Sequence, residues 1–233
     1  MDNSLAGKTA LVTGGSRGIG KAVARALYHT GARVIICGRE AKALVAAAKE
    51  IGEIICIPAD VRKDVKKLFR SIDRLDILVN NAGGMEHFED FEGTSLAAWR
   101  STFDLNVLSV VEVTRAALPL LRKSTGCVVN IASDVGRRPF HMGPDYCAAK
   151  AALINLTRYL ALELAPIRVN AVAPGPVPTG PWSPEQIRKA ASRTLAKRTG
   201  TVEEVASAVL LAVKNGYLNG AVVGVDGGAA RSP

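Results

Sequence analysis

The sequence has few cysteines and few aromatic residues. Its 233 residues include four cysteines, and Phe, Trp and Tyr together make up 5% of the chain. No two of the cysteines form a CxxC pair, and the first three of Cys37, Cys56, Cys127 and Cys147 lie in or beside apolar segments. Cysteines of this kind are usually small buried side chains. We therefore expect neither disulfides nor zinc, and no metal in the functional site.

Long hydrophobic runs are also missing. No apolar segment approaches the roughly 18 residues that a membrane-spanning helix needs. The opening segment Met1–Lys8 lacks the charged-then-apolar pattern of a secretion signal. From these two absences we predict a soluble, cytoplasmic protein with no membrane partner.

The chain is basic, with a formal net charge of +9. Its Lys and Arg residues are scattered rather than gathered in runs, and no basic stripe alternates with aromatic residues as in many nucleic-acid-binding proteins. General solubility explains most of this charge. We predict no nucleic-acid partner.

Short segments rich in Val and Ile alternate with helical patterns. The length and the 48% hydrophobic content suit one large domain over residues 1–233. The expected strands, buried on both faces, are 9–13, 33–37, 53–57, 77–80, 127–132, 168–173 and 221–225. The expected helices are 18–30, 40–51, 61–72, 95–123, 145–164 and 201–214. This alternation predicts an α/β fold, a Rossmann-type doubly wound parallel sheet of seven strands with helices on both faces.

A glycine-rich turn links the first expected strand to the first expected helix. Glycines at this place let backbone N–H groups approach a pyrophosphate at the helix N-terminus. The alternative is a glycine-rich turn that binds nothing. Because the strand and the helix are both in place, we predict a dinucleotide site that includes Gly14, Ser16, Arg17, Gly18, Ile19 and Gly20.

The residue after the second expected strand distinguishes the two nicotinamide dinucleotides. An Asp or Glu there hydrogen-bonds the ribose 2′-hydroxyl of NAD, whereas an Arg accommodates the 2′-phosphate of NADP. Here Arg39 closes the strand, and Arg17 offers a second guanidinium. The sequence predicts NADP(H), with the alternative that Arg39 is a solvated residue at a helix start.

Two other strand ends carry polar residues. Asp60-Val61 follows the third strand and can meet the adenine edge, although Asp60 can equally be the N-cap of a helix beginning near Val61. Small residues and amides follow the fourth strand, where they can hold neighbouring loops together beside the cofactor; a plain turn is the alternative. We predict Asp60, Val61, Asn81, Ala82 and Gly83 in the cofactor site.

Tyr146 and Lys150 are four positions apart on an expected helix and share one face. A free phenol has a pKa of about 10, and a nearby ammonium favours the phenolate, so we expect Lys150 to lower the pKa of Tyr146. Ser133 closes the fifth strand. Taken singly, Ser133 can be a strand-end hydroxyl and Tyr146 a core residue. Their joint spacing predicts proton transfer beside a nucleotide.

One proline-rich segment, Pro174–Pro184, breaks the alternation. Ligands of doubly wound sheets bind outside the carboxyl ends of the strands, so we expect an irregular substrate loop at about residues 176–198. The segment Gly84–His87, His141, Met142 and Trp182 are expected to line the pocket. A histidine such as His141 is more often a loop hydrogen-bonder than a catalyst.

In their order, these residues resemble the short-chain dehydrogenase/reductase family. The resemblance covers nearly the full length and rests on Thr13-Gly14-x-x-x-Gly18-x-Gly20, Asn80-Asn81-Ala82-Gly83, Asn106, Ser133, Tyr146-x-x-x-Lys150, Pro174-Gly175 and Val225-Asp226-Gly227-Gly228. It implies an oxidoreductase with an intact catalytic tetrad.

The resemblance also implies roles for single residues. Tyr146 is the general acid–base at the substrate oxygen, Lys150 lowers its pKa and holds the nicotinamide ribose, and Ser133 orients and polarises the substrate oxygen. Asn106 is expected to bend its helix and to hold a water that links Lys150 to solvent. The cofactor contacts that the resemblance adds are Tyr146, Lys150, Pro174, Gly175, Val177 and Thr179, the last near the carboxamide.

Within the family, Val225–Gly228 and Lys197–Ala206 look most like 3-oxoacyl-carrier-protein reductases. This likeness implies an NADPH-dependent reduction of a 3-oxoacyl thioester in fatty acid biosynthesis, with an acyl carrier protein as a partner. A sugar, polyol or small-ketone dehydrogenase would use the same tetrad and stays open. A remote alternative is a non-enzymatic sensor of the NADP redox state, which the intact tetrad disfavours. By resemblance, the long helices at 95–123 and 145–164 imply a homotetramer.

Overall fold

The computed structural model describes residues 3–85, 88–141 and 143–229. Seven strands form one sheet whose order is β3-β2-β1-β4-β5-β6-β7, and every pairing is parallel. The strands are β1 (Thr9–Thr13), β2 (Arg33–Gly38), β3 (Ile55–Pro58), β4 (Ile77–Asn80), β5 (Cys127–Ile131), β6 (Arg168–Pro174) and β7 (Val222–Val225). The predicted doubly wound sheet is confirmed.

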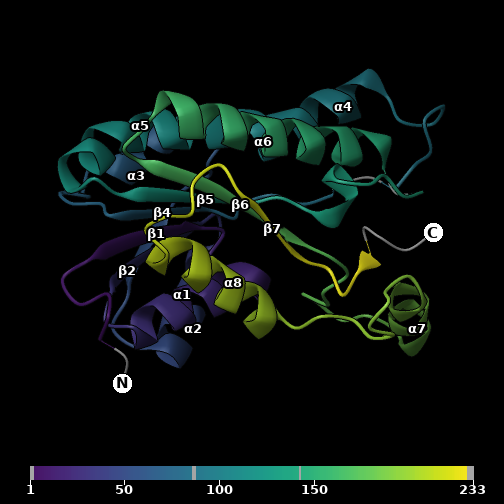
Figure 1. Cartoon of the computed structure of the whole chain (residues 1–233), viewed down its shortest axis with the longest axis horizontal. Coiled ribbons are helices and arrows are strands. Elements are labelled where there is room, and N and C mark those ends of the chain that lie inside the picture. Colours follow the sequence, from purple (N-terminus) through teal and green to yellow (C-terminus); the bar gives the residue numbers. More distant parts are fainter. Residues whose placement is uncertain (1–2, 86–87, 142, 230–233) are drawn as a thin grey trace.

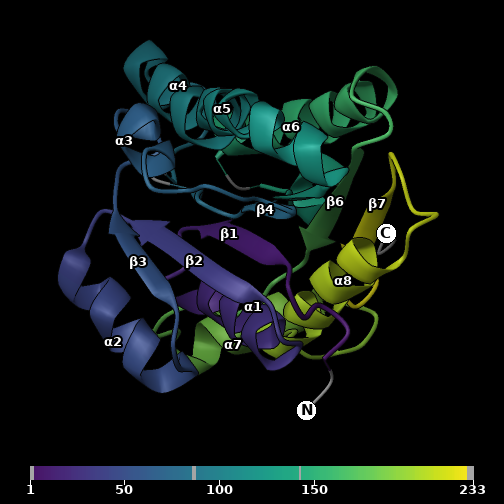
Figure 2. The same cartoon turned by 90° about the vertical axis from the view of Figure 1, so that its left-hand side faces the viewer.

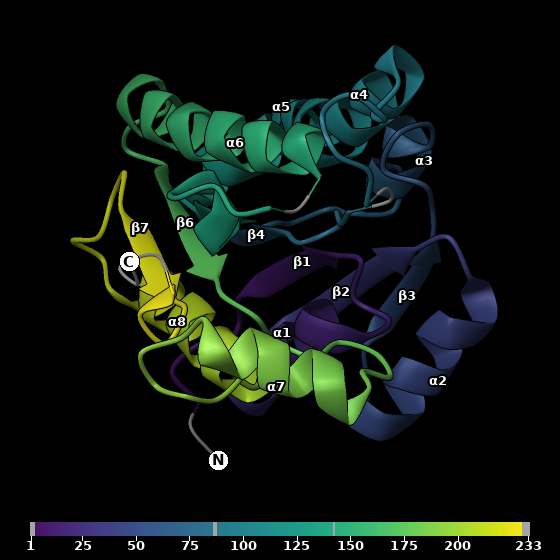
Figure 3. The same ribbon diagram turned by 90° about the vertical axis from the view of Figure 1, so that its right-hand side faces the viewer.

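Helices cover both faces of this sheet (Figures 1 and 2). One layer consists of α1 (Gly18–His29), α2 (Ala41–Ile51) and α8 (Val202–Lys214). The other consists of α3 (Val65–Phe69), α4 (Leu96–Phe103), α5 (Ser109–Ser124) and α6 (Pro144–Glu163). The helix α7 (Pro184–Ser192) stands apart from both layers in Figure 1, and in Figure 3 it lies in front of α1 and α8.

The hydrophobic core is divided by the sheet. Successive residues of a strand point to opposite faces, so Val12 packs with α1 and α8 while Leu11 packs with α5. The central strands β1 and β4 are buried along their whole length. Strand order reverses between β1 and β4, and in such folds the crevice outside the carboxyl ends at this point binds the ligand.

The two edge strands differ from expectation. We predicted β3 and β7 as buried on both faces, yet Ile55 of β3 is 37% exposed and Gly224 of β7 is also exposed. Each of these strands has a partner on one side only in the described sheet. Val and Ile content therefore marks a strand but does not show whether it lies inside the sheet or at its edge.

The predicted helix 95–123 is interrupted. Its middle, Asp104–Leu108, forms a π-helical turn between α4 and α5. Turns of this kind often occur at functional sites, because the extra residue per turn redirects a side chain. Asn106 lies in this turn and is 1% exposed.

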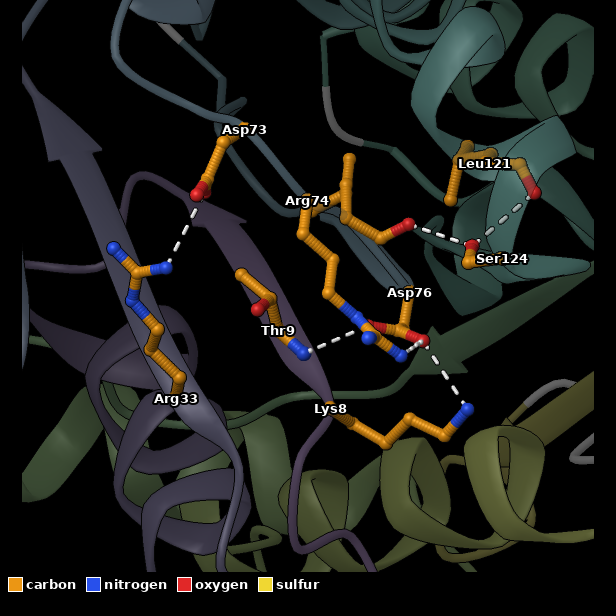
Figure 4. Close-up of polar contacts among 9 residues, drawn as sticks. Lys8, Thr9, Arg33, Asp73, Arg74, Asp76, Leu121 and Ser124 are labelled. Carbon is orange, nitrogen blue, oxygen red and sulfur yellow. Dashed lines mark hydrogen bonds and ion pairs between the residues drawn. The ribbon is translucent and has the colours of Figure 1, made fainter.

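A polar cluster closes the amino end of the sheet (Figure 4). Asp76, just before β4, is 3% exposed and accepts hydrogen bonds from Thr9 N at 2.9 Å, Lys8 Nζ at 3.1 Å and Arg74 Nε at 2.8 Å. Burial alone would raise the pKa of Asp76, but these donors outweigh it and hold that pKa at about 2. The cluster fixes the start of β1 against the start of β4.

None of the described helices is both long and apolar enough to cross a bilayer.

Candidate active site

The loop after β1 forms a cradle that admits only glycine at several positions. Gly14 and Gly18 have φ values of 64° and 54°, which L-residues with a side chain rarely adopt. At Gly20 a Cβ atom would lie 2.3 Å from the Gly14 carbonyl oxygen. The backbone of this loop therefore stays bare, and a phosphate can approach it closely.

The N-terminus of α1 opens on this cradle. Its N-cap, Arg17, makes no side-chain hydrogen bond to the first turn, so backbone N–H groups there are left for a ligand. Asn81, after β4, holds the loop in place because its Nδ2 donates to the carbonyls of Thr13 at 2.9 Å and Gly14 at 3.1 Å. This geometry fits the pyrophosphate of a dinucleotide.

A single cavity of about 560 Å³ runs along the carboxyl ends of the strands. Its walls come from the glycine loop, the ends of β2 to β6 and the first turns of α6. All the predicted cofactor residues line it: Gly14, Ser16, Arg17, Gly18, Ile19, Gly20, Arg39, Asp60, Val61, Asn81, Ala82, Gly83, Tyr146, Lys150, Pro174, Gly175, Val177 and Thr179. Ser133 lines it too, whereas Asn106 lies behind its wall.

Guanidinium groups gather at one end of this cavity. Arg39 and Arg17 are exposed there, and Arg62, which the sequence analysis did not single out, is a third arginine of the lining. Arg62 pairs with Asp60 at 3.4 Å. Burial raises the pKa of Asp60, but the hydrogen bonds from Arg62 outweigh it, so that the pKa lies below its ordinary value.

The alternative role of Asp60 as a helix N-cap is wrong. The helix α3 begins at Val65, not near Val61. Asp60 Oδ1 accepts Arg62 N–H at 2.9 Å, and Asp60 N–H donates to Asp64 Oδ2 at 2.9 Å. These local bonds form a turn in place of the first helical residues, as Asp side chains often do.

Ser133, Tyr146 and Lys150 meet at the other end of the cavity. The Lys150 ammonium lies 5.5 Å from the centroid of the Tyr146 ring and donates to the Ile131 carbonyl at 3.0 Å. Ser133, at the end of β5, interacts with the Tyr146 phenol in the direction that lowers its pKa. Position Gly83 is close to the ammonium, since a Cβ there would be 3.3 Å from Lys150 Nζ.

Burial governs the acidities of this group. It raises the pKa of Tyr146 to about 12 and lowers the pKa of Lys150 to about 8. Our expectation of a lowered Tyr146 pKa is therefore not met, because desolvation of the phenol outweighs the interaction with Ser133 that lowers it. At pH 7 the phenol keeps its proton and Lys150 is still mostly charged.

Asn106 ties the π-helical turn to the cavity wall. Its Oδ1 accepts Gly84 N–H at 3.0 Å, and its Nδ2 donates to the carbonyls of Gly84 at 2.9 Å and Thr102 at 3.0 Å. These bonds hold the Gly83-Gly84 backbone beside Lys150. Asn106 is thus placed as a support of the site.

The predicted substrate loop is partly regular. Within residues 176–198 the structure has the helix α7, which begins with a capping box between Ser183 and Gln186 and has Pro184 at its first position. This capping box can be read from the sequence, but the many prolines around it led us to expect an irregular loop. Of the expected pocket residues, Gly84 and Met85 line the cavity, whereas His141 and Trp182 do not. Glu86, His87 and Met142 lie outside the described residues.

Asp134 is a second residue that the sequence analysis missed. It directly follows Ser133 and is 4% exposed. An acidic residue after a strand is usually a turn residue, so its burial could not be foreseen. Within the described chain, no three His, Cys, Asp or Glu side chains form a cluster that could hold a metal ion.

Comparison with known proteins agrees with this geometry. The short chain dehydrogenase family matches residues 8–189. The chain belongs to this family. It is therefore an oxidoreductase that acts on CH–OH groups and binds a nicotinamide cofactor.

Relatives of this short-chain dehydrogenase have different substrates. It is 38% identical to the rhamnolipids biosynthesis 3-oxoacyl-[acyl-carrier-protein] reductase of Pseudomonas aeruginosa, over 97% of each chain. It is 35% identical to the L-fucose dehydrogenase of Bos taurus, over 98% of this chain and 92% of the other. Among solved structures, the Pseudomonas aeruginosa RhlG/NADP active-site complex superimposes with a TM-score of 0.89 at 36% identity, over 99% of each chain.

Proposed function

We propose that this short-chain dehydrogenase is an NADPH-dependent reductase of 3-oxoacyl thioesters. The observation that supports it most is one cavity with guanidinium groups at one end and Ser133, Tyr146 and Lys150 at the other. A dinucleotide held by the glycine cradle between them would direct its nicotinamide toward Tyr146. The thioester substrate rests on the likeness to the 3-oxoacyl-[acyl-carrier-protein] reductase of Pseudomonas aeruginosa, and an acyl carrier protein is the proposed partner.

The proposed preference for NADP(H) rests on Arg39 and Arg17. Both are exposed in the cavity lining next to the carboxyl end of β2, where a 2′-phosphate would lie. Planar guanidinium groups bind a phosphate dianion by paired, charge-assisted hydrogen bonds. Arg62 adds positive charge to the same end. The solved NADP complex of a relative with 36% identity is consistent with this choice.

In the proposed reaction, Tyr146 gives its proton to the substrate carbonyl oxygen. The nicotinamide supplies the hydride when bound. As negative charge develops on the oxygen, the phenol and the Ser133 hydroxyl are the groups placed to stabilise it. The raised pKa of Tyr146 suits this direction, because the phenol is fully protonated at neutral pH. Lys150 then returns a proton toward Tyr146, since its pKa of about 8 makes the ammonium a ready donor.

A second candidate is a sugar dehydrogenase. It is favoured by the L-fucose dehydrogenase of Bos taurus, which matches 98% of this chain at 35% identity. The same Ser133, Tyr146 and Lys150 would serve, with Tyr146 receiving the proton of a sugar hydroxyl. The phenolate that this direction needs is disfavoured by the raised pKa of Tyr146, so oxidation would require alkaline pH.

The deciding experiment is a matched assay of both substrate classes. NADPH oxidation would be followed with acetoacetyl-N-acetylcysteamine and acetoacetyl carrier protein, and NADP reduction with L-fucose, each with the protein and with Tyr146→Phe. We expect turnover of the thioesters that is lost in Tyr146→Phe. Turnover of L-fucose alone would replace the proposal with the second candidate.

The proposed assembly is a homotetramer. Large apolar side chains are exposed on the helices that the family resemblance assigns to subunit contacts: Leu108 is 52%, Tyr159 is 59% and Leu162 is 82% exposed. Burying such residues between copies would remove apolar surface from water. Light scattering would show a mass four times that of the chain; a monomer would contradict the proposal.

A further inference from the structure

The helix that carries Tyr146 begins without a side-chain cap. α6 starts at Pro144, which has no N–H, and the N-cap before it is Gly143, which has no side chain to accept a bond from the first turn. Amides in the first turn of a helix need a partner outside the helical hydrogen-bond ladder. The start of α6, two residues before the proposed proton donor, therefore depends on a contact from elsewhere in the fold.

Asp145 supplies this contact. It is 1% exposed, and neither Asp145 nor Thr102 lines the cavity. Its Oδ1 accepts Tyr146 N–H at 2.8 Å, and its Oδ2 accepts the hydroxyl of Thr102, on α4, at 2.5 Å. Hydrogen bonds from a hydroxyl to a carboxylate are short and roughly twice as strong as those between neutral groups. Asp145 thus ties the first turn of α6 to α4.

Thr102 links two parts of the site. It is 1% exposed, and while its hydroxyl donates to Asp145, its carbonyl accepts Asn106 Nδ2 at 3.0 Å. Asn106 in turn binds both the N–H and the carbonyl of Gly84 in the cavity wall. A continuous line of hydrogen bonds therefore runs from Gly84 through Asn106, Thr102 and Asp145 to the backbone of Tyr146.

We propose that Thr102 and Asp145 are positioning residues that fix the Tyr146 phenol relative to the Gly84 side of the cavity. Both act through the backbone of Tyr146. Proton transfer requires the phenol within about 3 Å of the substrate oxygen, and a displacement of about 1 Å can reduce the rate by roughly 10²-fold. Loss of the Thr102 hydroxyl would release the first turn of α6, and with it the phenol, but would leave the glycine cradle in place.

The inference rests on the proposed function, because Tyr146 is taken there to transfer the proton. It does not depend on the substrate, since thioester reduction and sugar oxidation would both use the phenol. The loss is expected in kcat, because the phenol acts in the chemical step. Binding of NADPH should change little, because the glycine cradle lies at the other end of the cavity.

The first test is Thr102→Val, which keeps the shape of the side chain and removes its hydroxyl. We expect kcat for the reduction of acetoacetyl-N-acetylcysteamine to fall roughly 10-fold or more, with the dissociation constant of NADPH close to that of the unmodified protein. Thr102→Ser keeps the hydroxyl and should restore most of kcat. If the protein reduces no thioester but oxidises L-fucose, the same comparison is made with L-fucose.

The matched control is Thr114→Val. Thr114, on α5, is 3% exposed, and its hydroxyl accepts a hydrogen bond from Asn80 Nδ2 at 3.0 Å, outside the line that leads to Tyr146. This replacement also removes a buried hydroxyl, so it should lower the melting temperature as Thr102→Val does. Its kcat should be unchanged. An unchanged kcat in Thr102→Val, or an equal loss in Thr114→Val, would overturn the inference.

A second readout requires no turnover. Amide hydrogen exchange reports local opening, and ¹H–¹⁵N NMR would follow the amide of Tyr146. We expect roughly 10-fold faster exchange in Thr102→Val and no change in Thr114→Val. Unchanged exchange in Thr102→Val would overturn the inference even if kcat falls. A protein that turns over neither substrate class would refute the proposed function and leave this readout decisive.

Asp145→Asn is the second variant, should Thr102→Val fail to fold. The amide has the same shape as the carboxylate but offers one oxygen to two donors, Thr102 O–H and Tyr146 N–H. We expect a smaller loss of kcat and a smaller rise in Tyr146 amide exchange, in the same directions. No change in either quantity would overturn the inference.

Discussion

Two buried aspartates at opposite ends of the sheet have opposite acidities. Asp76, before β4, is 3% exposed, and Asp134, after β5, is 4% exposed. Both oxygens of Asp76 accept hydrogen bonds from Thr9, Lys8 and Arg74 (Figure 4), whereas Asp134 Oδ2 has no partner among the described residues. The pKa of Asp76 is held at about 2, while burial raises that of Asp134.

The contrast shows that burial does not set the acidity of a carboxyl group by itself. Where donors surround the carboxylate, its charge stabilises the fold; where they do not, the charge acts on its neighbours. The amino end of the sheet is organised for stability. The carboxyl end leaves one buried oxygen, Asp134 Oδ2, without a hydrogen-bond partner among the described residues, next to Ser133 in the cavity wall. This is expected where a ligand and a reaction must be accommodated.

The largest effect that we expect is a loss of activity on substitution of Tyr146, at the carboxyl end of the sheet. Tyr146→Phe removes the proposed proton donor and should reduce kcat for carbonyl reduction by roughly 10³-fold, the range of general acid catalysis. The melting temperature should stay close to that of the unmodified protein, because the ring remains. Steady-state kinetics and calorimetry measure both. Asp76→Asn is the matched control and should lower stability while a folded sample retains activity.

The next effect compares two arginines at opposite ends of β2. Arg39, after its carboxyl end, has no ion pair among the described residues, whereas Arg33 at its amino end pairs with Asp73 at 3.3 Å. Arg39→Ala should reduce the preference for NADPH over NADH by roughly 10- to 100-fold, because a charge-assisted bond to the 2′-phosphate is lost. Dissociation constants from fluorescence titration measure this ratio. Arg33→Ala should leave the ratio unchanged, and an unchanged ratio in Arg39→Ala would refute NADP selection by this residue.

A smaller effect is expected on the free energy of unfolding when Asp76, at the amino end of the sheet, is replaced by Asn. The pKa of Asp76 in the fold, about 2, is below the ordinary 3.8, so its charge stabilises the folded state above pH 4. Asp76→Asn should therefore lower the free energy of unfolding by about 2 kcal/mol at pH 7. Urea unfolding from pH 7 down to pH 2 should show this difference shrinking as the pH falls toward 2. A difference that does not depend on pH would mean that the charge is not the cause.

The smallest effect, and of opposite sign, is expected at Asp134. Its pKa in the fold lies above the ordinary value, so ionisation opposes folding at neutral pH and protonation relieves it. Asp134→Asn should raise the free energy of unfolding at pH 7, because it removes a charge that opposes folding there. The gain should vanish below the ordinary pKa of an aspartate, where both proteins are neutral. Urea unfolding of the unmodified protein and of Asp134→Asn over the same pH range measures the gain. A loss of stability in Asp134→Asn at pH 7 would contradict the opposite acidities of Asp76 and Asp134.

The sequence was informative wherever a local pattern has one physical explanation. Six strands keep both predicted ends to within one residue, because apolar runs of Val and Ile between turns have few other uses. The glycine loop could be predicted because a backbone without side chains is needed for a phosphate to approach it closely. The predicted cofactor residues all face one cavity, although their binding role stays a prediction.

Other features escaped the sequence because they depend on distant partners. The residues around Asn106 do not predict a π-helical turn, and the expected bend at Asn106 came from the family resemblance alone. A bond that holds the turn in place comes from Gly84, across the cavity wall. The exposure of β3 depends on its place at the edge of the sheet. The late start of α3, by contrast, has a local cause, because Asp60 N–H donates to the side chain of Asp64. Asp64 could therefore have indicated it from the sequence.

The sequence by itself determined the alternation of strands and helices, the glycine cradle and the spacing of Tyr146 and Lys150, because these are set by neighbours along the chain. Only the tertiary structure decided the acidities. From the sequence we predicted a lowered pKa for Tyr146, whereas its pKa is raised. The sequence also did not show that the pKa of Asp76 is lowered and that of Asp134 is raised. Desolvation and hydrogen bonding depend on which groups the fold brings together, and those groups come from segments far apart in the chain.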